Sequence, residues 1–157
     1  MTRCLASLAI LLAASCSAPA APGSVRPTAG QVTPSPKHEG ATVPRYLLNE
    51  QVTQLTIAAT ICKPGWTKTI RPPSSYTQRI ERQKLPAGAD SKAYVVDHLI
   101  ALEIGGAPRE PRNLMLQTNE ASKAKNRDEN AYHRAVCAGR MTLEAARDDM
   151  YRNWKPT

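Results

Sequence analysis

The first 44 residues lack the composition of a folded domain, which confines the fold to about residues 45–157. Between residues 17 and 44 there are six prolines among Ala, Gly, Ser and Thr, and few side chains that a core would bury. Such a stretch is typical of an extended, flexible tether. The sequence therefore predicts a tether over 16–44 and one domain of ordinary size over 45–157.

The extreme N-terminus reads as an export signal. Arg3 precedes an apolar run over residues 5–14 that is too short to span a bilayer, and small residues follow. We expect residues 1–15 to be removed. Cys16 follows Ala-Ala-Ser, which resembles the lipobox of bacterial lipoproteins, and we expect Cys16 to carry the lipid that anchors the protein to a membrane. Cleavage after a small-x-small site at residues 18–20 is the alternative, and would give a periplasmic or secreted protein.

The predicted domain contains no Phe, so its core must be built from Leu, Ile, Val, Ala, Tyr and Trp and will be small. Two of the four cysteines, Cys62 and Cys137, lie within it. In an oxidising compartment a disulfide between them would stabilise the fold by on the order of 3–5 kcal/mol. The domain has neither a CxxC pair nor a Cys/His cluster, and a structural zinc site is not expected.

Local patterns give the expected elements. Residues 51–57 fit either a helix or a strand. The remaining predictions are a strand over Trp66–Arg71, a helix over Ser75–Gln83, a strand over Tyr94–Val96 that ends at Asp97-His98, a long helix over Asn119–Val136, and a last helix capped by Thr142 and running to Trp154.

A carboxylate, an imidazole and a carboxamide follow one another in the middle of the domain. Asp97 and His98 stand at the end of the predicted strand, and Asn113 follows the Gly-Gly turn at 105–106. His98 has a suitable pKa to act as a general base, and Asp97 is a hard oxygen ligand for a cation. Neighbouring side chains on a regular strand point to opposite faces, so a shared site requires the strand to end or bulge there. The Asn113 amide would fix either the loop backbone or the imidazole.

The long helix adds polar residues at helical spacing. Asn119, Lys123, Asn126, Asn130 and His133 fall on one stripe, and most of it suits a solvated face. We expect Asn126 to be the second metal ligand, with Asn119 as the alternative. His133 lies about 10 Å further along the helix and is left outside the site.

Basic residues suggest a polyanionic partner. The formal net charge of the chain is +8. We expect Lys123, Lys125 and Arg127 to grip phosphates without reading bases, although they would equally serve to solubilise the helix.

The segments D-H-L-I-A-L-E-I-G-G from Asp97, P-R-N-L around Asn113, and the later Asn119 and Asn126 resemble the HNH, or ββα-metal, endonuclease superfamily. The chain is similar to small exported bacterial proteins of that type over nearly the whole domain. The resemblance implies an α+β fold in which a β-hairpin packs on a helix, with additional helices and one disulfide. It also implies Asp97 as a metal ligand, His98 as general base, Asn113 as the middle Asn, and a helix residue as the last ligand.

The last ligand departs from the superfamily pattern, because many members have His there and this chain offers Asn126. Asn brings no charge, which favours Mg²⁺ or Mn²⁺ over Zn²⁺. We therefore expect an exported, metal-dependent endonuclease with little sequence specificity, acting on DNA ahead of RNA and using no organic cofactor. The alternatives are a non-catalytic envelope lipoprotein that binds DNA or another polyanion through a degenerate ββα core, and a purely structural lipoprotein.

Overall fold

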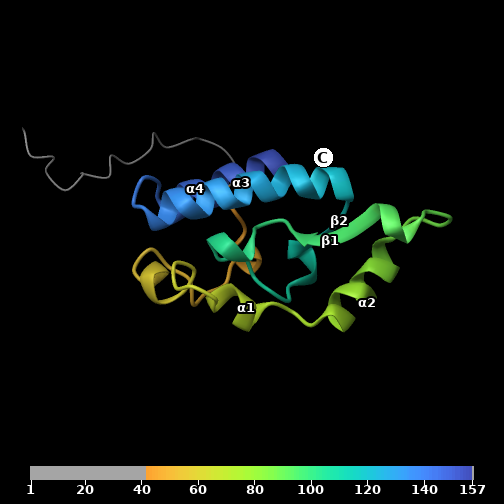
Figure 1. Ribbon diagram of the computed structural model, residues 1–157, viewed down its shortest axis with the longest axis horizontal. Coiled ribbons are helices and arrows are strands. Elements are labelled where there is room, and N and C mark those ends of the chain that lie inside the picture. The colour runs from red at the N-terminus through yellow and green to blue at the C-terminus, as the bar shows by residue number, and fades with distance from the viewer. Residues whose placement is uncertain (1–41, 157) are drawn as a thin grey trace, which may run out of the picture. The chain divides into compact units, whose positions relative to one another are not determined.

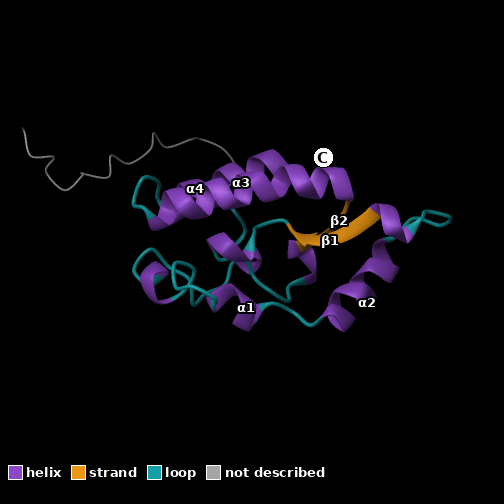
Figure 2. Cartoon of the chain, in the orientation of Figure 1, coloured by secondary structure: helices purple, strands orange, loops and turns teal. Residues whose placement is uncertain are grey.

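The computed structural model describes residues 42–156. The predicted signal (1–15), the lipidation site Cys16 and the tether up to residue 41 lie outside this range. The helices and strands are α1 (Trp66–Ile70), α2 (Ser74–Lys84), β1 (Tyr94–His98), β2 (Leu114–Thr118), α3 (Asn119–Cys137) and α4 (Leu143–Trp154) (Figures 1 and 2). Short 3-10 turns lie at Arg45–Leu47, Ile57–Ala59, Ser91–Ala93, Leu102–Ile104 and Pro111–Asn113. Together they form a fold of the α+β class. No helix in this range is long and apolar enough to cross a membrane.

The two strands form one antiparallel pair that lies between α2 and α3 (Figure 1). The register pairs Tyr94 with Thr118 and His98 with Leu114, so the end of β1 lies beside the beginning of β2. Residues 99–113 connect the strands through two 3-10 turns in place of a tight hairpin turn. Because β2 leads directly into α3, the hairpin and this helix are consecutive along the chain.

The Gly-Gly pair in this connection permits close backbone packing. Gly105 has a φ of 79°, a left-handed conformation that favours glycine. A Cβ on Gly106 would lie 1.8 Å from the carbonyl oxygen of Ile100. Any side chain at Gly106 would therefore push the connection away from the Ile100 backbone, which the site described below depends on.

The two long helices begin at side-chain caps. The Thr118 hydroxyl accepts a hydrogen bond from the Ala121 N–H at 3.2 Å, and the Thr142 hydroxyl accepts one from the Ala145 N–H at 3.1 Å. These bonds satisfy helix N–H groups that have no partner within the helix. The predicted long helix and the predicted Thr142 cap are confirmed, as is the helix predicted over Ser75–Gln83.

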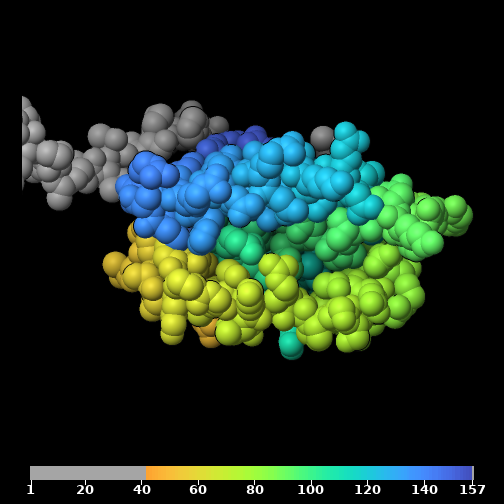
Figure 3. Space-filling model, in the orientation of Figure 1, coloured from red at the N-terminus to blue at the C-terminus, as the bar shows by residue number. Residues whose placement is uncertain are grey.

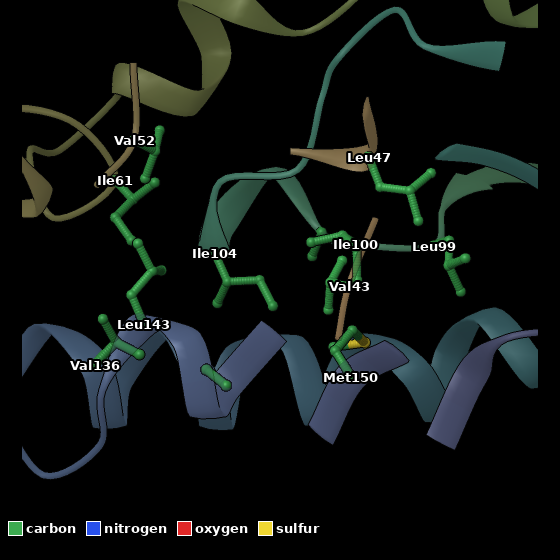
Figure 4. Close-up of a cluster of buried hydrophobic side chains, with 12 residues drawn as sticks. Val43, Leu47, Val52, Ile61, Leu99, Ile100, Ile104, Val136, Leu143 and Met150 are labelled. Atoms are coloured by element: carbon green, nitrogen blue, oxygen red, sulfur yellow. The ribbon is translucent and has the colours of Figure 1, made fainter. Parts of the chain in front are cut away.

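The hydrophobic core lies where α3 and α4 meet the loop segments. Side chains from the loops point toward the helices in Figure 4. The labelled members of the cluster are Val43, Leu47, Val52, Ile61, Leu99, Ile100, Ile104, Val136, Leu143 and Met150. The predicted disulfide is confirmed: Cys62 and Cys137 are bonded, with 5.5 Å between their Cα atoms and a separation of 75 positions in the sequence.

The strand predicted over Trp66–Arg71 is wrong, because this segment forms the short helix α1. Trp66 and Ile70 are four residues apart, and both are half-buried, whereas Lys68 and Thr69 are exposed. Trp66 packs against the core cluster. An apolar pair at this spacing shares one face of a helix, and burial of that face outweighs the local alternation that suggested a strand.

The N-terminal boundary of the fold also differs from the prediction. Val43, which was assigned to the tether, is buried in the core with 5% of its surface exposed. Residues 51–57, for which helix and strand were both open, form turns that lead into the 3-10 turn Ile57–Ala59. The described fold therefore includes Val43, two residues before the predicted boundary.

Candidate active site

A polar cavity of about 170 Å³ lies between the end of β1 and the middle of α3. Its lining residues come from four segments. They are Arg71 after α1, Asp97 and His98 of β1, residues 101–103 of the connection, and Asn126, Glu129 and Asn130 of α3. In Figure 3 the hairpin segment, in green and teal, is visible between α3 and the α1–α2 segment. The structure thus brings Asp97, His98 and Asn126 to one cavity.

Asp97 and His98 line the same cavity because β1 ends at His98. One carboxylate oxygen of Asp97 accepts a hydrogen bond from the His98 N–H at 2.8 Å. The next N–H, that of Leu99, donates to the Asn113 carbonyl at 2.7 Å, and after it the chain leaves the strand. The strand therefore ends at the two residues, as a shared site requires, and their side chains are not forced to opposite faces of the sheet.

His98 is held as a buried, neutral ring. Only 6% of its surface is exposed, and its Nε2 lies 3.0 Å from the carbonyl oxygen of Pro108. Because a carbonyl oxygen only accepts, Nε2 carries the proton and Nδ1 is the ring's basic atom. Burial lowers the pKa of His98 below 6.5; Arg71 and Lys125 also lower it, and the Pro108 bond and Asp97 raise it. At neutral pH the imidazole can therefore accept a proton.

Asn113 is fully buried and fixes the connection. Its side-chain oxygen accepts from the Ile100 N–H at 2.8 Å, and its amide nitrogen donates to the carbonyls of Ile100 (3.1 Å) and Ala107 (2.9 Å). It does not line the cavity. Of the two expectations for its amide, the structure shows the one in which Asn113 fixes the loop backbone, so we treat this predicted catalytic-site residue as a positioning residue. By holding Ala107, it also places the adjacent Pro108 carbonyl against His98.

Lys125 is the largest departure from the expected site. It was expected to grip phosphates, but its side chain has 0% exposure and lies under the cavity. Its ammonium is 3.5 Å from a carboxylate oxygen of Asp97 and forms a short ion pair with Glu129. The same Asp97 oxygen accepts from the Gln117 amide at 2.6 Å. A buried lysine requires such partners, which makes it unavailable to a nucleic-acid backbone.

Glu129 lines the cavity and has an altered acidity. Its burial raises its pKa to about 7, against the opposing effect of the Lys125 ammonium. The i, i+4 spacing of Lys125 and Glu129 indicates that the two side chains can form an ion pair on the helix. It does not indicate that the pair is buried, because the same spacing is common on exposed helix faces. Arg71 and Glu103 were also missed. They form an ion pair of 3.1 Å at the cavity, although 32 residues separate them in sequence.

The structure separates the two candidate ligands on α3. Asn126 lines the cavity, whereas the Asn119 side chain donates to the Lys92 carbonyl at 2.7 Å, near the other end of the hairpin. Lys123 and Arg127 are exposed on α3 and have no carboxylate partner among residues 42–156. They remain available for phosphate contacts.

The cavity offers the donors of a hard cation. No three His, Cys, Asp or Glu side chains in the described part of the chain converge as metal ligands. Asp97, Glu129 and Asn126, whose side chains carry oxygen donors, nevertheless line one polar space. Oxygen donors completed by water suit Mg²⁺ or Mn²⁺, and one histidine without cysteine does not suit zinc. If a hard divalent cation binds in this cavity, Asp97, Asn126 and Glu129 are the residues that would hold it, and it would compete with the Lys125 ammonium for Asp97.

The comparisons with known proteins add no assignment. No protein-family model, no curated protein and no solved structure matches the chain.

Proposed function

We propose that this protein is a metal-dependent endonuclease of the HNH type, which hydrolyses phosphodiester bonds of nucleic acid with low sequence specificity. The observation that carries the proposal is the state of His98. It is a buried ring whose Nε2 is fixed by the Pro108 carbonyl, and it shares a polar cavity with Asp97 and Asn126. In this proposal β1, β2 and α3 are the ββα-metal core.

The proposed reaction assigns one task to each part of the cavity. His98 accepts at Nδ1 the proton of the attacking water, as its neutral form allows. Asp97, Asn126 and Glu129 would hold Mg²⁺ or Mn²⁺, which supplies charge stabilisation to the phosphate and to the leaving oxygen. Asn113 acts through the connection and keeps the Pro108 carbonyl on Nε2. No organic cofactor is required for this reaction.

We propose low sequence specificity because the exposed side chains near the cavity are basic and would contact phosphates, which are the same for every base. Lys123 and Arg127 are exposed on the helix that carries Asn126, and they would contact phosphates. Such contacts do not distinguish one base from another. We retain DNA ahead of RNA as the proposed substrate.

The disulfide supports the proposal that the protein is exported. Disulfides persist in oxidising compartments and are rare in the cytosol, and Cys62 and Cys137 are bonded here. Export to the bacterial envelope, with a lipid on Cys16, is therefore kept as part of the proposed function, with release into the periplasm or medium as its alternative.

One observation favours a second candidate, a non-catalytic module that binds DNA or another polyanion. The Lys125 ammonium already lies 3.5 Å from Asp97 and is paired with Glu129, so a fixed cation already neutralises two of the side chains that would hold the metal ion in the proposed enzyme. A degenerate ββα core that keeps its shape and has lost its reaction would tolerate this arrangement. The two candidates differ in whether divalent cations and His98 are needed.

The deciding experiment compares His98→Gln with His133→Gln in the full chain. Glutamine can still donate to the Pro108 carbonyl, but it has no basic atom to accept the proton from water. At position 133 the same change keeps a donor for the Ile61 carbonyl, which His133 Nε2 contacts at 2.9 Å. Supercoiled plasmid and single-stranded RNA are incubated with each protein in Mg²⁺, Mn²⁺, Zn²⁺ or EDTA.

The expected result is cleavage by the wild type and by His133→Gln in Mg²⁺ or Mn²⁺, with loss in EDTA and in His98→Gln. Retention of full cleavage by His98→Gln would remove His98 as the base. Binding without cleavage by all three proteins, with every cation, would establish the binding module instead.

A further inference from the structure

A second polar groove, of about 320 Å³, lies beside α2 and is separate from the cavity of His98. It is lined by Pro73, Ser75, Tyr76 and Arg79 on one side and by Arg109 of the connection on the other. None of these residues is acidic. Both arginines are exposed, and the proposed reaction does not use them.

The two guanidinium groups of this groove have no carboxylate partner within residues 42–156. The nearest acidic residue in sequence, Glu110, is already paired with Arg112 at 2.6 Å. The guanidinium of Arg79 lies 5.1 Å from the centre of the Tyr76 ring, which uses the face of the cation and leaves its N–H donors free. The groove therefore presents uncompensated positive charge together with unused hydrogen-bond donors.

The walls of the groove are fixed to one another. The Tyr76 hydroxyl donates to the backbone carbonyl of Arg109 at 2.6 Å, which ties the connection to α2. The two arginines are thus carried by elements in direct contact, so the backbone on both sides of the groove is held in place before a ligand binds. A preformed site binds its ligand with less loss of conformational entropy.

Two chain segments lead from this groove to the candidate active site. On one side, Arg71 lines the His98 cavity and Pro73, two residues later, lines the groove. On the other side, the Pro108 carbonyl contacts His98 and the next residue is Arg109. Two residues of extended chain span at most about 7 Å, and DNA rises about 3.4 Å per nucleotide along each strand. The groove and the cavity are therefore within a few nucleotides of each other.

We propose that the groove between Arg79 and Arg109 binds the phosphodiester backbone of a nucleic-acid strand and leads that strand to the His98 cavity. The identity of the strand rests on the proposed function. A strand is favoured over a membrane surface because Arg79 and Arg109, which are unpaired within the described residues, flank a groove whose lining comes within two residues of the His98 cavity in sequence, and a bilayer cannot enter that cavity. This surface differs from Lys123 and Arg127 on α3.

The test measures binding without cleavage. The full chain carrying His98→Gln is titrated in EDTA into a short fluorescein-labelled single-stranded oligonucleotide, and anisotropy is followed over a series of salt concentrations. The test variant adds Arg79→Gln and Arg109→Gln. The matched control adds Arg134→Gln, in the last turn of α3, and Arg140→Gln, in the turn that follows the helix; both arginines are exposed and line neither cavity.

Each phosphate contact to a single strand contributes about 0.7 to the slope of log K against log salt, which is about fivefold in affinity at about 0.1 M salt. The test variant should therefore bind about 25-fold more weakly than its parent, with a slope smaller by about 1.4. The control, which removes the same charge, should lose only a small part of this affinity. Circular dichroism and thermal midpoints are compared to confirm that all three proteins are folded.

Equal losses in the two double variants would reduce the proposal to general charge attraction and overturn it, as would unchanged binding by the test variant. A third arm uses vesicles containing phosphatidylglycerol. If the test variant loses vesicle binding and keeps oligonucleotide binding, the groove faces a membrane and the proposal fails. If oligonucleotide binding falls as expected while the wild type cleaves nothing in Mg²⁺ or Mn²⁺, the groove is supported and the proposed catalysis is rejected.

Discussion

The Nε2 atom of His98 lies 3.0 Å from the carbonyl oxygen of Pro108, ten residues later in the chain. This contact determines which ring nitrogen bears the proton, and burial lowers the pKa of the ring. The imidazole is therefore in its basic form at lower pH than an exposed histidine.

The first prediction concerns the pH dependence of cleavage. Because the pKa of His98 lies below 6.5, kcat/KM should rise with pH and reach its plateau below the pH that an ordinary histidine would require. This rise of kcat/KM with pH should be absent in His98→Gln, which should retain only residual activity. A kcat/KM profile in saturating Mg²⁺ measures this. If the midpoint of this rise lies above pH 6.5, His98 is not the general base.

The same lowered pKa has a consequence for stability. Below 6.5 the unfolded chain binds a proton at His98 that the folded chain resists, so the free energy of unfolding should fall as pH decreases from 6.5 through the lowered pKa. His98→Gln should remove this part of the acid sensitivity. Urea titrations at several pH values measure the effect, and His133→Gln provides the matched control.

Another prediction concerns the buried cation. Lys125→Met should lower the free energy of unfolding near neutral pH by about 3–5 kcal/mol, because it leaves the carboxylates of Asp97 and Glu129 without a counter-charge. A carboxyl with a raised pKa binds more protons in the folded state, so its burial becomes more costly as pH rises from 4.5 to about 7. The defect should therefore be smaller at pH 5 than at pH 8.

The matched control for this prediction is the double variant Lys125→Met with Glu129→Gln. It removes one carboxylate together with the ammonium, and should recover part of the lost stability at pH 8. Urea unfolding of both variants at the two pH values measures the difference. If the single variant is equally destabilised at both, Glu129 does not titrate in this range.

The disulfide should account for a large part of the stability. Reduction of Cys62–Cys137, or the double change to alanine, should lower the free energy of unfolding by about 2–5 kcal/mol, because a long loop is no longer closed in the unfolded chain. Urea unfolding with and without dithiothreitol measures the change. A thiol assay of the non-reduced domain should detect no free thiol from Cys62 or Cys137. Detection of two free thiols would contradict the disulfide.

Asn113→Ala should act on the fold before it acts on the reaction. The change removes three hydrogen bonds, two of them buried, and leaves backbone groups of Ile100 and Ala107 unpaired, at a cost of about 1–3 kcal/mol for each group that finds no water. His98→Gln should cost much less stability and more activity. Thermal unfolding and initial rates on the two variants distinguish positioning from chemistry. If Asn113→Ala is as stable as His98→Gln and still loses activity, Asn113 takes a direct part in the reaction.

Several elements were predictable because a local signal and the tertiary structure agree. Thr142 caps α4 as expected, and α3 follows from its composition. The segment Trp66–Ile70 was predicted as a strand because five residues are too few to distinguish the helical from the strand periodicity. It forms a helix in which Trp66 packs against the core. Val43 was assigned to the tether because one valine among prolines gives no periodic signal.

The positions of some site residues were predictable from the sequence, and those of others were not. The sequence placed Asp97 and His98 at a strand end, and both reach the cavity. It could not reveal that Lys125 is buried, because a lysine in a charged helix is exposed far more often than not. Nor could it join Arg71 to Glu103, since only the three-dimensional fold brings those segments together.

The covalent link between Cys62 and Cys137 encloses the whole candidate site. Every residue that lines the His98 cavity, from Arg71 to Asn130, lies between the two cysteines in sequence. A protease that cuts the backbone once anywhere in this interval produces two fragments that stay on one molecule. Each fragment keeps its part of the fold beside the other, so a nicked protein can retain its site until a reductant separates the pieces.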